Sequence, residues 1–154
     1  MAVLAAALMT RHVFEYALLR VVPRVERGEA VNAGVIVYCR GVDYLGARVH
    51  LDVARLHALD PDADHEAIAR ALDAVADVCA VAAPPRSDRR TDGALAADGP
   101  AAGEDIGRRF RRLTAPRSTV VQPGPVHTGL TADPEAETDR LLRELVLPLR
   151  GCAR

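Results

Sequence analysis

The chain has 154 residues, of which 49% are hydrophobic, so it is large enough to form one folded domain around a buried core. Its formal net charge of -1 excludes a general electrostatic attraction to nucleic acid or to an anionic membrane. All 20 basic residues are arginine, which excludes a lysine Schiff base and a phosphate-loop lysine.

The first half of the chain predicts an antiparallel meander of three strands with short links. The strand predicted over His12–Val22 is apolar on both faces, as in a strand covered from both sides, and Pro23 ends it. A second strand is predicted over Val31–Cys39, where Gly34 indicates a bulge or a close backbone approach. The third, Tyr44–Leu51, alternates between apolar and polar residues.

Helices are predicted after the meander and at the end of the chain. Asp52 caps a short segment through Leu59, and a longer helix over about 64–81 carries an apolar stripe of Ile68, Leu72, Val75 and Cys79. Asp133 and Pro134 begin the last helix, whose stripe is Leu141, Leu142, Leu145 and Val146.

The region between these helices is less regular. Residues 86–105 are small and polar and predict a flexible insertion, and a strand is predicted over Arg108–Thr114. Another short strand is expected over Thr119–Gln122, after which Pro123-Gly124-Pro125 predicts a turn. Together, these elements predict an α+β fold of two layers. A mainly antiparallel sheet, formed by the three-strand meander plus one or two C-terminal strands, packs against two main helices.

This fold is expected to occupy residues 10–150 as a single domain. Residues 1–9 are expected to be a non-native or disordered extension, with Met9 as the natural start. The three cysteines form no Cys-x-x-Cys pair, which favours free thiols, no metal site and no cofactor in a cytoplasmic protein. No stretch approaches the roughly 20 apolar residues of a membrane helix.

An arginine cluster stands out, because residues 106–132 contain no acidic residue but include Arg108, Arg109, Arg111, Arg112 and Arg117. On a strand, Arg109 and Arg111 share one face while Arg108 and Arg112 share the opposite face with Phe110, so they do not all reach one ligand. A solvated strand is the favoured interpretation. Weak nucleic-acid binding through Arg109 and Arg111 is the alternative.

Hydroxyl, amide and guanidinium groups around two turns are candidates for a small-anion site, since these groups bind oxyanions. The alternatives are an ion-pair network in the first hairpin and hydroxyls that cap backbone groups in the second turn. The candidate residues are Arg20, Arg24, Asn32, Arg117, Ser118, Gln122, His127 and Thr128.

Two long motifs resemble a bacterial family, domain of unknown function 3037. They are EYALLRVVPR, within residues 14–29 and followed by Val31–Val35, and LTAPRSTVVQPGPVHTGL over Leu113–Leu130. The resemblance covers about residues 10–147. It implies no particular reaction, and it implies an accessory or partner role beside a kinase resembling the HipA toxin.

The leading hypothesis is therefore a non-enzymatic binding or accessory module, because no catalytic signature such as G-x-S-x-G or H-E-x-x-H is present. The alternative is an enzyme acting on a phosphorylated or nucleotide substrate. That alternative requires Arg20, Asn32, Arg117 and His127 to converge in one pocket.

Overall fold

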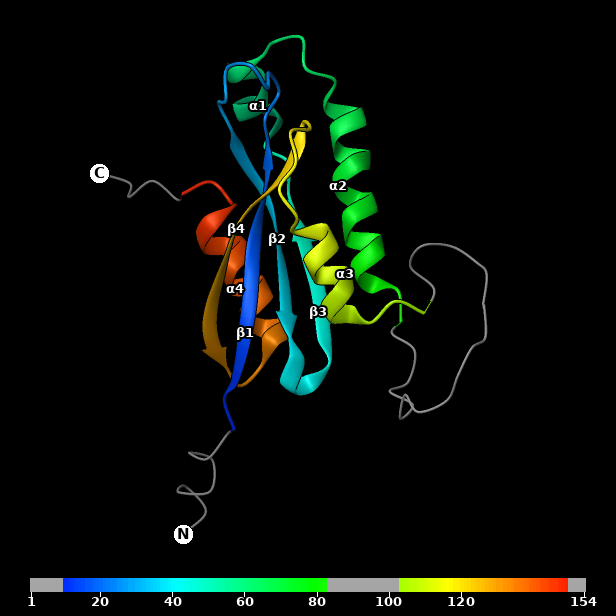
Figure 1. The fold of residues 1–154 in the computed structure, drawn as a ribbon. Helices are drawn as coiled ribbons and strands as arrows, with labels where there is room; N and C mark the ends of the chain where they lie inside the picture. The colour runs from blue at the N-terminus through cyan, green and yellow to red at the C-terminus, as the bar shows by residue number, and fades with distance from the viewer. Residues whose placement is uncertain (1–9, 83–102, 150–154) are drawn as a thin grey trace, which may run out of the picture.

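The computed structural model describes residues 10–82 and 103–149, and its centre is a four-stranded antiparallel sheet (Figure 1). The strand order is β3-β2-β1-β4, so the predicted meander of the first three strands is confirmed. The strands are β1 (His12–Val21), β2 (Val31–Cys39), β3 (Tyr44–Val49) and β4 (Val121–Thr131).

Four α-helices and one 3-10 turn, η2, accompany the sheet in the described part of the chain. Each α-helix begins after an aspartate whose carboxylate accepts a backbone N–H of the first turn, which satisfies a donor that the helix itself leaves unpaired. The elements are η2 (Arg40–Val42), α1 (Val53–Leu59), α2 (His65–Ala80), α3 (Ile106–Leu113) and α4 (Pro134–Leu145), capped by Asp52, Asp64, Asp105 and Asp133.

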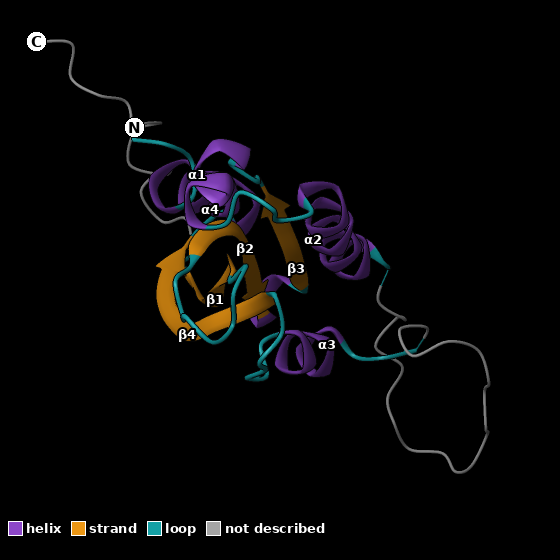
Figure 2. Ribbon diagram, turned by 90° about the horizontal axis from the view of Figure 1, so that it is seen from above, coloured by secondary structure: helices purple, strands orange, loops and turns teal. Residues whose placement is uncertain are grey.

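Helices cover both faces of the sheet, with α4 on one face and α2 and α3 on the other (Figure 2). The α+β class and the antiparallel sheet are therefore confirmed, but the predicted two-layer arrangement is replaced by three layers. The reason lies in β2, whose apolar side chains are buried on both faces. Its α4 face carries Val35, Val37 and Cys39, and its other face carries Ala33, Ile36 and Tyr38.

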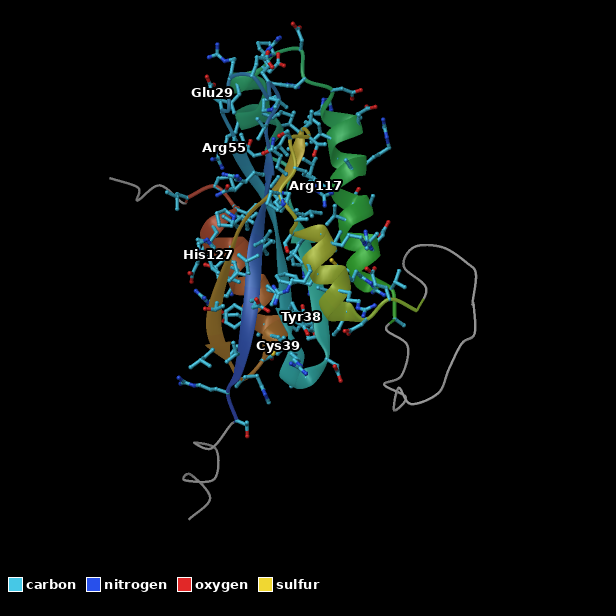
Figure 3. All side chains as sticks on the ribbon, in the orientation of Figure 1. Glu29, Tyr38, Cys39, Arg55, Arg117 and His127 are labelled. Atoms are coloured by element: carbon cyan, nitrogen blue, oxygen red, sulfur yellow. The ribbon has the colours of Figure 1, made fainter. Side chains whose placement is uncertain are left out.

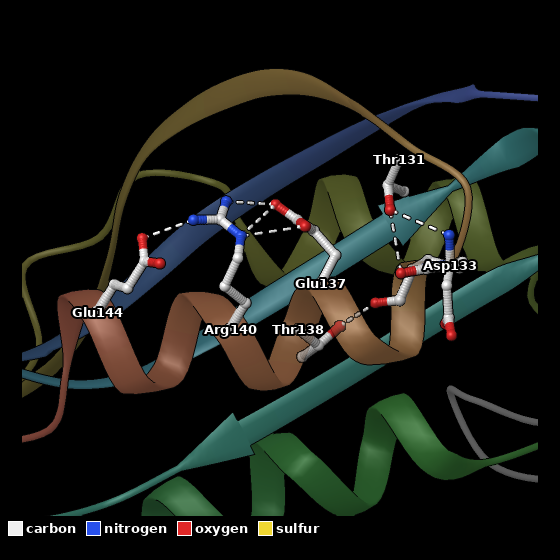
Figure 4. A network of polar contacts seen from close by, with 7 residues as sticks. Thr131, Asp133, Glu137, Thr138, Arg140 and Glu144 are labelled. Carbon is white, nitrogen blue, oxygen red and sulfur yellow. Dashed lines mark hydrogen bonds and ion pairs between the residues drawn. The ribbon is translucent and has the colours of Figure 1, made fainter. Parts of the chain in front are cut away.

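Polar contacts hold α4 in place at its N-terminal end (Figure 4). The Thr131 hydroxyl donates to the backbone carbonyl of Asp133 at 3.0 Å and accepts the Asp133 N–H at 3.1 Å. Thr138, which is fully buried, lies 2.9 Å from the hydroxyl of Tyr44 on β3. These contacts set α4 over β2 and β3 and leave the same face of β1 and β4 less covered.

The segment predicted as a strand over Arg108–Thr114 is instead helix α3, so this prediction is wrong. Asp105 caps the helix, and its buried side chains recur at helical rather than alternating spacing. They are Ile106, Arg109, Phe110 and Leu113.

The turn predicted at Pro123-Gly124-Pro125 is also wrong, because β4 continues through it. The proline residues are tolerated there because β4 is an edge strand and the register with β1 shifts between Ala17 and Leu19. Gly124 and Pro125 together lie opposite Leu18, which is a β-bulge.

Gly34 lies beside a second register shift, between β1 and β2, which confirms the bulge or close backbone approach predicted there. A Cβ on Gly34 would lie 2.9 Å from the carbonyl oxygen of Arg48. The shift passes over Ala33, so Asn32 rather than Ala33 lies opposite Arg20. The bulge therefore decides which polar side chains meet on the α4 face.

The whole predicted extension, residues 1–9, and residues 86–102 of the predicted insertion lie outside the described residues. Glu104 and Asp105, at the end of the predicted insertion, belong to the fold. Glu104 accepts hydrogen bonds from Arg112 at 3.3 and 2.9 Å, and Asp105 caps α3. Among the helices of the described ranges, none has the length and apolar character needed to span a membrane.

The ion pair of Glu104 and Arg112 is expected to make stability depend on pH. Hydrogen bonds from Arg112 lower the pKa of Glu104, so its stabilising effect is complete above the ordinary pKa and is lost as the pH falls through the lowered value. Glu104→Gln should cost about 0.5–1 kcal/mol near neutral pH and less at about pH 3. Urea unfolding at both pH values measures this, with the exposed Glu26→Gln as control. A cost independent of pH would contradict the role of this ion pair.

Candidate functional site

A groove of about 640 Å³ lies between α2, the end of β1 and the start of β4. Figure 1 shows α2 running beside the start of β4. Its size falls in the range of roughly 300–1,000 Å³ that is typical of ligand pockets. The walls are mainly apolar and include Leu19, Ile68, Val75, Leu113, Val121 and Pro123.

The groove exists because α2 presents small side chains to it. Ala67 and Ala71, one turn apart, are exposed and leave the space that larger side chains would fill. The lining residues of α2 and its cap extend from Asp64 to Val75, which at 1.5 Å per residue gives a length of about 16 Å. The groove is therefore elongated along the helix.

One end of the groove is acidic. Asp60 is only 7% exposed, forms an ion pair with Arg24 at 3.2 Å and accepts the backbone N–H of Asp62. Asp62 and Asp64 are exposed on the same rim. Arg24 neutralises only one of these three carboxylates, so this rim keeps a negative potential.

Arg117 lies at another part of the groove, in the loop between α3 and β4. Its guanidinium donates to the backbone carbonyls of Arg112 at 2.8 Å and of Ala115 at 3.4 Å. Thr119 donates to the carbonyl of Val121. These hydrogen bonds order the loop, as expected for hydroxyls that cap backbone groups, and Ser118 is exposed beside them.

The opposite face of the sheet brings three predicted residues together. Arg20 on β1 lies directly opposite Asn32 on β2 and Gln122 on β4. The Asn32 amide donates to the carbonyl of Leu145 on α4 at 3.1 Å, which identifies this as the α4 face. The Nε atom of Arg20 is buried and has no hydrogen-bond partner in the described residues. An unpaired buried donor costs about 1–3 kcal/mol, so it calls for an explanation.

His127 and Thr128 point to opposite faces of β4, as neighbours on a strand do. His127 lies opposite Tyr16 with ring centroids 5.2 Å apart, on the face of Arg20, and is exposed. Thr128 lies opposite Glu15, on the face of α3. Figure 3 shows His127 well separated from Arg117.

The predicted anion site is therefore divided among separate places. Arg20, Asn32 and Gln122 form one row, with His127 further along the same face. Arg24 and Arg117 belong to the groove region on the other face. The four residues required for an enzyme pocket do not converge, and this geometry does not favour the enzymatic alternative.

Three of the four arginine residues of α3 make hydrogen bonds or ion pairs within the fold, and Arg108 is exposed. Arg109 is 0% exposed and donates to the carbonyls of Val78 and Val81, at the end of α2, and of Glu104. Arg111 forms a bidentate pair with Glu15 at 2.9 and 2.8 Å. Because Arg109 is completely buried, its guanidinium is not accessible to a nucleic acid. In the sequence, the helical spacing of the apolar residues around Arg109 was the sign that this segment is a helix with a buried face.

The thiols of Cys39 and Cys79 are free and buried, and burial raises the pKa of Cys79 to about 12. Cys79 therefore lacks the character of an activated nucleophile. Within residues 10–82 and 103–149, no three His, Cys, Asp or Glu side chains are arranged to hold a metal ion.

The fold and these sites define an α+β protein with a groove on one sheet face and a polar row on the other. The family described as Protein of unknown function (DUF3037) matches the chain over residues 16–146. The chain belongs to this family, which confirms the resemblance of its two motifs. No curated protein and no solved structure matches the chain.

Proposed function

We propose that this protein is a non-enzymatic binding module whose groove along α2 holds a basic, amphipathic segment of a partner protein. The observation that carries the proposal is the groove itself, with apolar walls about 16 Å long and an acidic rim. An amphipathic helix of two to three turns has this length and lays its apolar face into such grooves.

The negative charge of the rim favours a partner segment with basic side chains. Asp62 and Asp64 are exposed, so arginine or lysine residues on the partner segment would pair with them, whereas acidic residues would be repelled. No histidine or cysteine is among the described residues that line the groove, which supports binding rather than catalysis. A kinase resembling HipA, the partner that the family resemblance implies, is the first partner to test.

The test is co-purification of this kinase from cells that express both proteins, with a variant that fills the groove. Ala71→Arg places a long side chain in the groove from an exposed position and should reduce the retained kinase by about tenfold or more, a loss of 1.4 kcal/mol or greater. Ala74→Arg adds the same charge to an exposed position of α2 outside the groove and should retain the kinase as the wild type does.

One result would overturn the groove as the binding surface, and another would exclude the kinase as its partner. Equal retention by Ala71→Arg and wild type would show that the groove is not the binding surface. Absence of the kinase from the wild-type sample, with both proteins present in the lysate, would exclude this kinase as the partner.

A further inference from the structure

We infer that the protein carries a second binding site, for the phosphate group of a small molecule, at the row formed by Arg20, Asn32 and Gln122. This site lies on the α4 face of the sheet, whereas the groove lies on the face of α2 and α3. The inference does not depend on the proposed function.

The two β-bulges create the row. Because Ala33 is passed over in the pairing of β1 with β2, Asn32 lies opposite Arg20, and Gln122 lies opposite Arg20 on the other side. Neighbouring strands are about 4.8 Å apart, so the three residues span about 10 Å across the sheet. All three are only partly buried, and α4 packs on β2 and β3 rather than on β1 and β4. A ligand therefore has access to the row.

Among the described residues, Arg20 is partly buried but has no ion-pair partner, whereas six other arginine residues of the fold pair with a carboxylate. Within the described ranges no ion pair or hydrogen bond of the Arg20 side chain is found, and its Nε atom is buried. Its side chain crosses β4 at Gly124, where a Cβ would lie 3.6 Å from Nε. In contrast, carboxylates pair with Arg24, Arg27, Arg48, Arg111, Arg112 and Arg140.

A partly buried guanidinium without an ion pair favours an anionic ligand. The flanking amides add neutral donors. Asn32 uses one N–H for the Leu145 carbonyl and keeps another, and the amide of Gln122 has two. A guanidinium and two amides arranged in a row match the three terminal oxygens of a phosphate monoester better than the two of a carboxylate.

The test is a titration of the full-length protein with inorganic phosphate at constant ionic strength, followed in ¹H–¹⁵N spectra of the arginine Nε–H groups. The Nε–H signal of Arg20 should shift saturably with phosphate, and acetate should cause a shift only at concentrations about tenfold higher or more. This measurement needs only the wild-type protein to locate the site.

Variants then test the donors by calorimetry. Phosphate affinity should fall about tenfold or more in Arg20→Gln and about threefold or more in Gln122→Ala, because each loses hydrogen bonds to the oxyanion. Arg70→Gln removes the same charge from an exposed position of α2 and should bind as the wild type does. The groove variant Ala71→Arg should also bind phosphate normally, which separates this site from the partner groove.

Three results would overturn the inference. The first is an Arg20 Nε–H signal that does not respond to phosphate. The second is an equal response to acetate, which would assign the site to carboxylates. The third is an equal loss of phosphate affinity in Arg70→Gln and Arg20→Gln, which would reduce the effect to overall charge.

Discussion

Replacing Arg109 with alanine is expected to lower the free energy of unfolding by about 3–5 kcal/mol. Arg109 is completely buried in α3, and its guanidinium donates to the carbonyls of Val78 and Val81 at the end of α2. Removing it leaves these acceptors without their donor and opens a cavity between the two helices. Urea unfolding of the variant and the wild type measures the difference.

The neighbouring Arg108→Ala is the matched control, because Arg108 is exposed on the same helix and its loss should change the stability by no more than about 0.5 kcal/mol. The two variants lose the same charge. A similar stability for both would mean that Arg109 is solvated and that α3 is not fastened to α2 in this way.

The second large effect is expected for Leu72→Ala, which should destabilise the protein by about 2–5 kcal/mol. Leu72 is 1% exposed and packs in the core between α2 and the sheet, as predicted from its place in the helical stripe. The lost contacts and the remaining cavity both contribute. Thermal or urea unfolding checks the value.

Leu145→Ala provides the comparison, because the same helical pattern predicts a buried position there and the structure shows otherwise. Leu145 is 37% exposed, while Leu141 and Val146 fill the core beside it at 3% and 1%. We therefore expect Leu145→Ala to cost no more than about 1 kcal/mol. Equal losses in the two variants would show that α4 is rotated relative to the structure described above.

The two proposed sites lie on opposite faces of one sheet, so the proposed partner segment and phosphate group would occupy separate surfaces. The connection between them is β1, where Leu19 lines the groove and the adjacent Arg20 belongs to the polar row.

Local patterns in the sequence were sufficient for much of the fold. Short links between apolar strands predicted the meander, and Asp52 and Asp133 were recognised as helix caps. These features depend on residues that are close in sequence, and the carboxylate of an N-cap contacts its own helix. The two family motifs are likewise contiguous strings and are found without the structure.

The arginine-rich segment shows where local patterns were misleading. Its arginine residues indicated a solvated strand, yet Ile106, Phe110 and Leu113 recur at helical spacing after Asp105. The helical period was thus present in the sequence. Arg109 can belong to the buried stripe because its guanidinium donates to carbonyls at the end of α2. These carbonyls are distant in sequence, so the local pattern did not reveal them.

The candidate sites depended most on tertiary structure. Arg20, Asn32 and Gln122 were identified by residue type, but two β-bulges set the strand register that brings them into one row. Arg117 belonged to the same predicted site and lies on the other face of the sheet, at the groove. The sequence by itself therefore determined which polar residues the chain carries, and strand register decided which of them meet, because a shift of one residue turns a side chain to the opposite face.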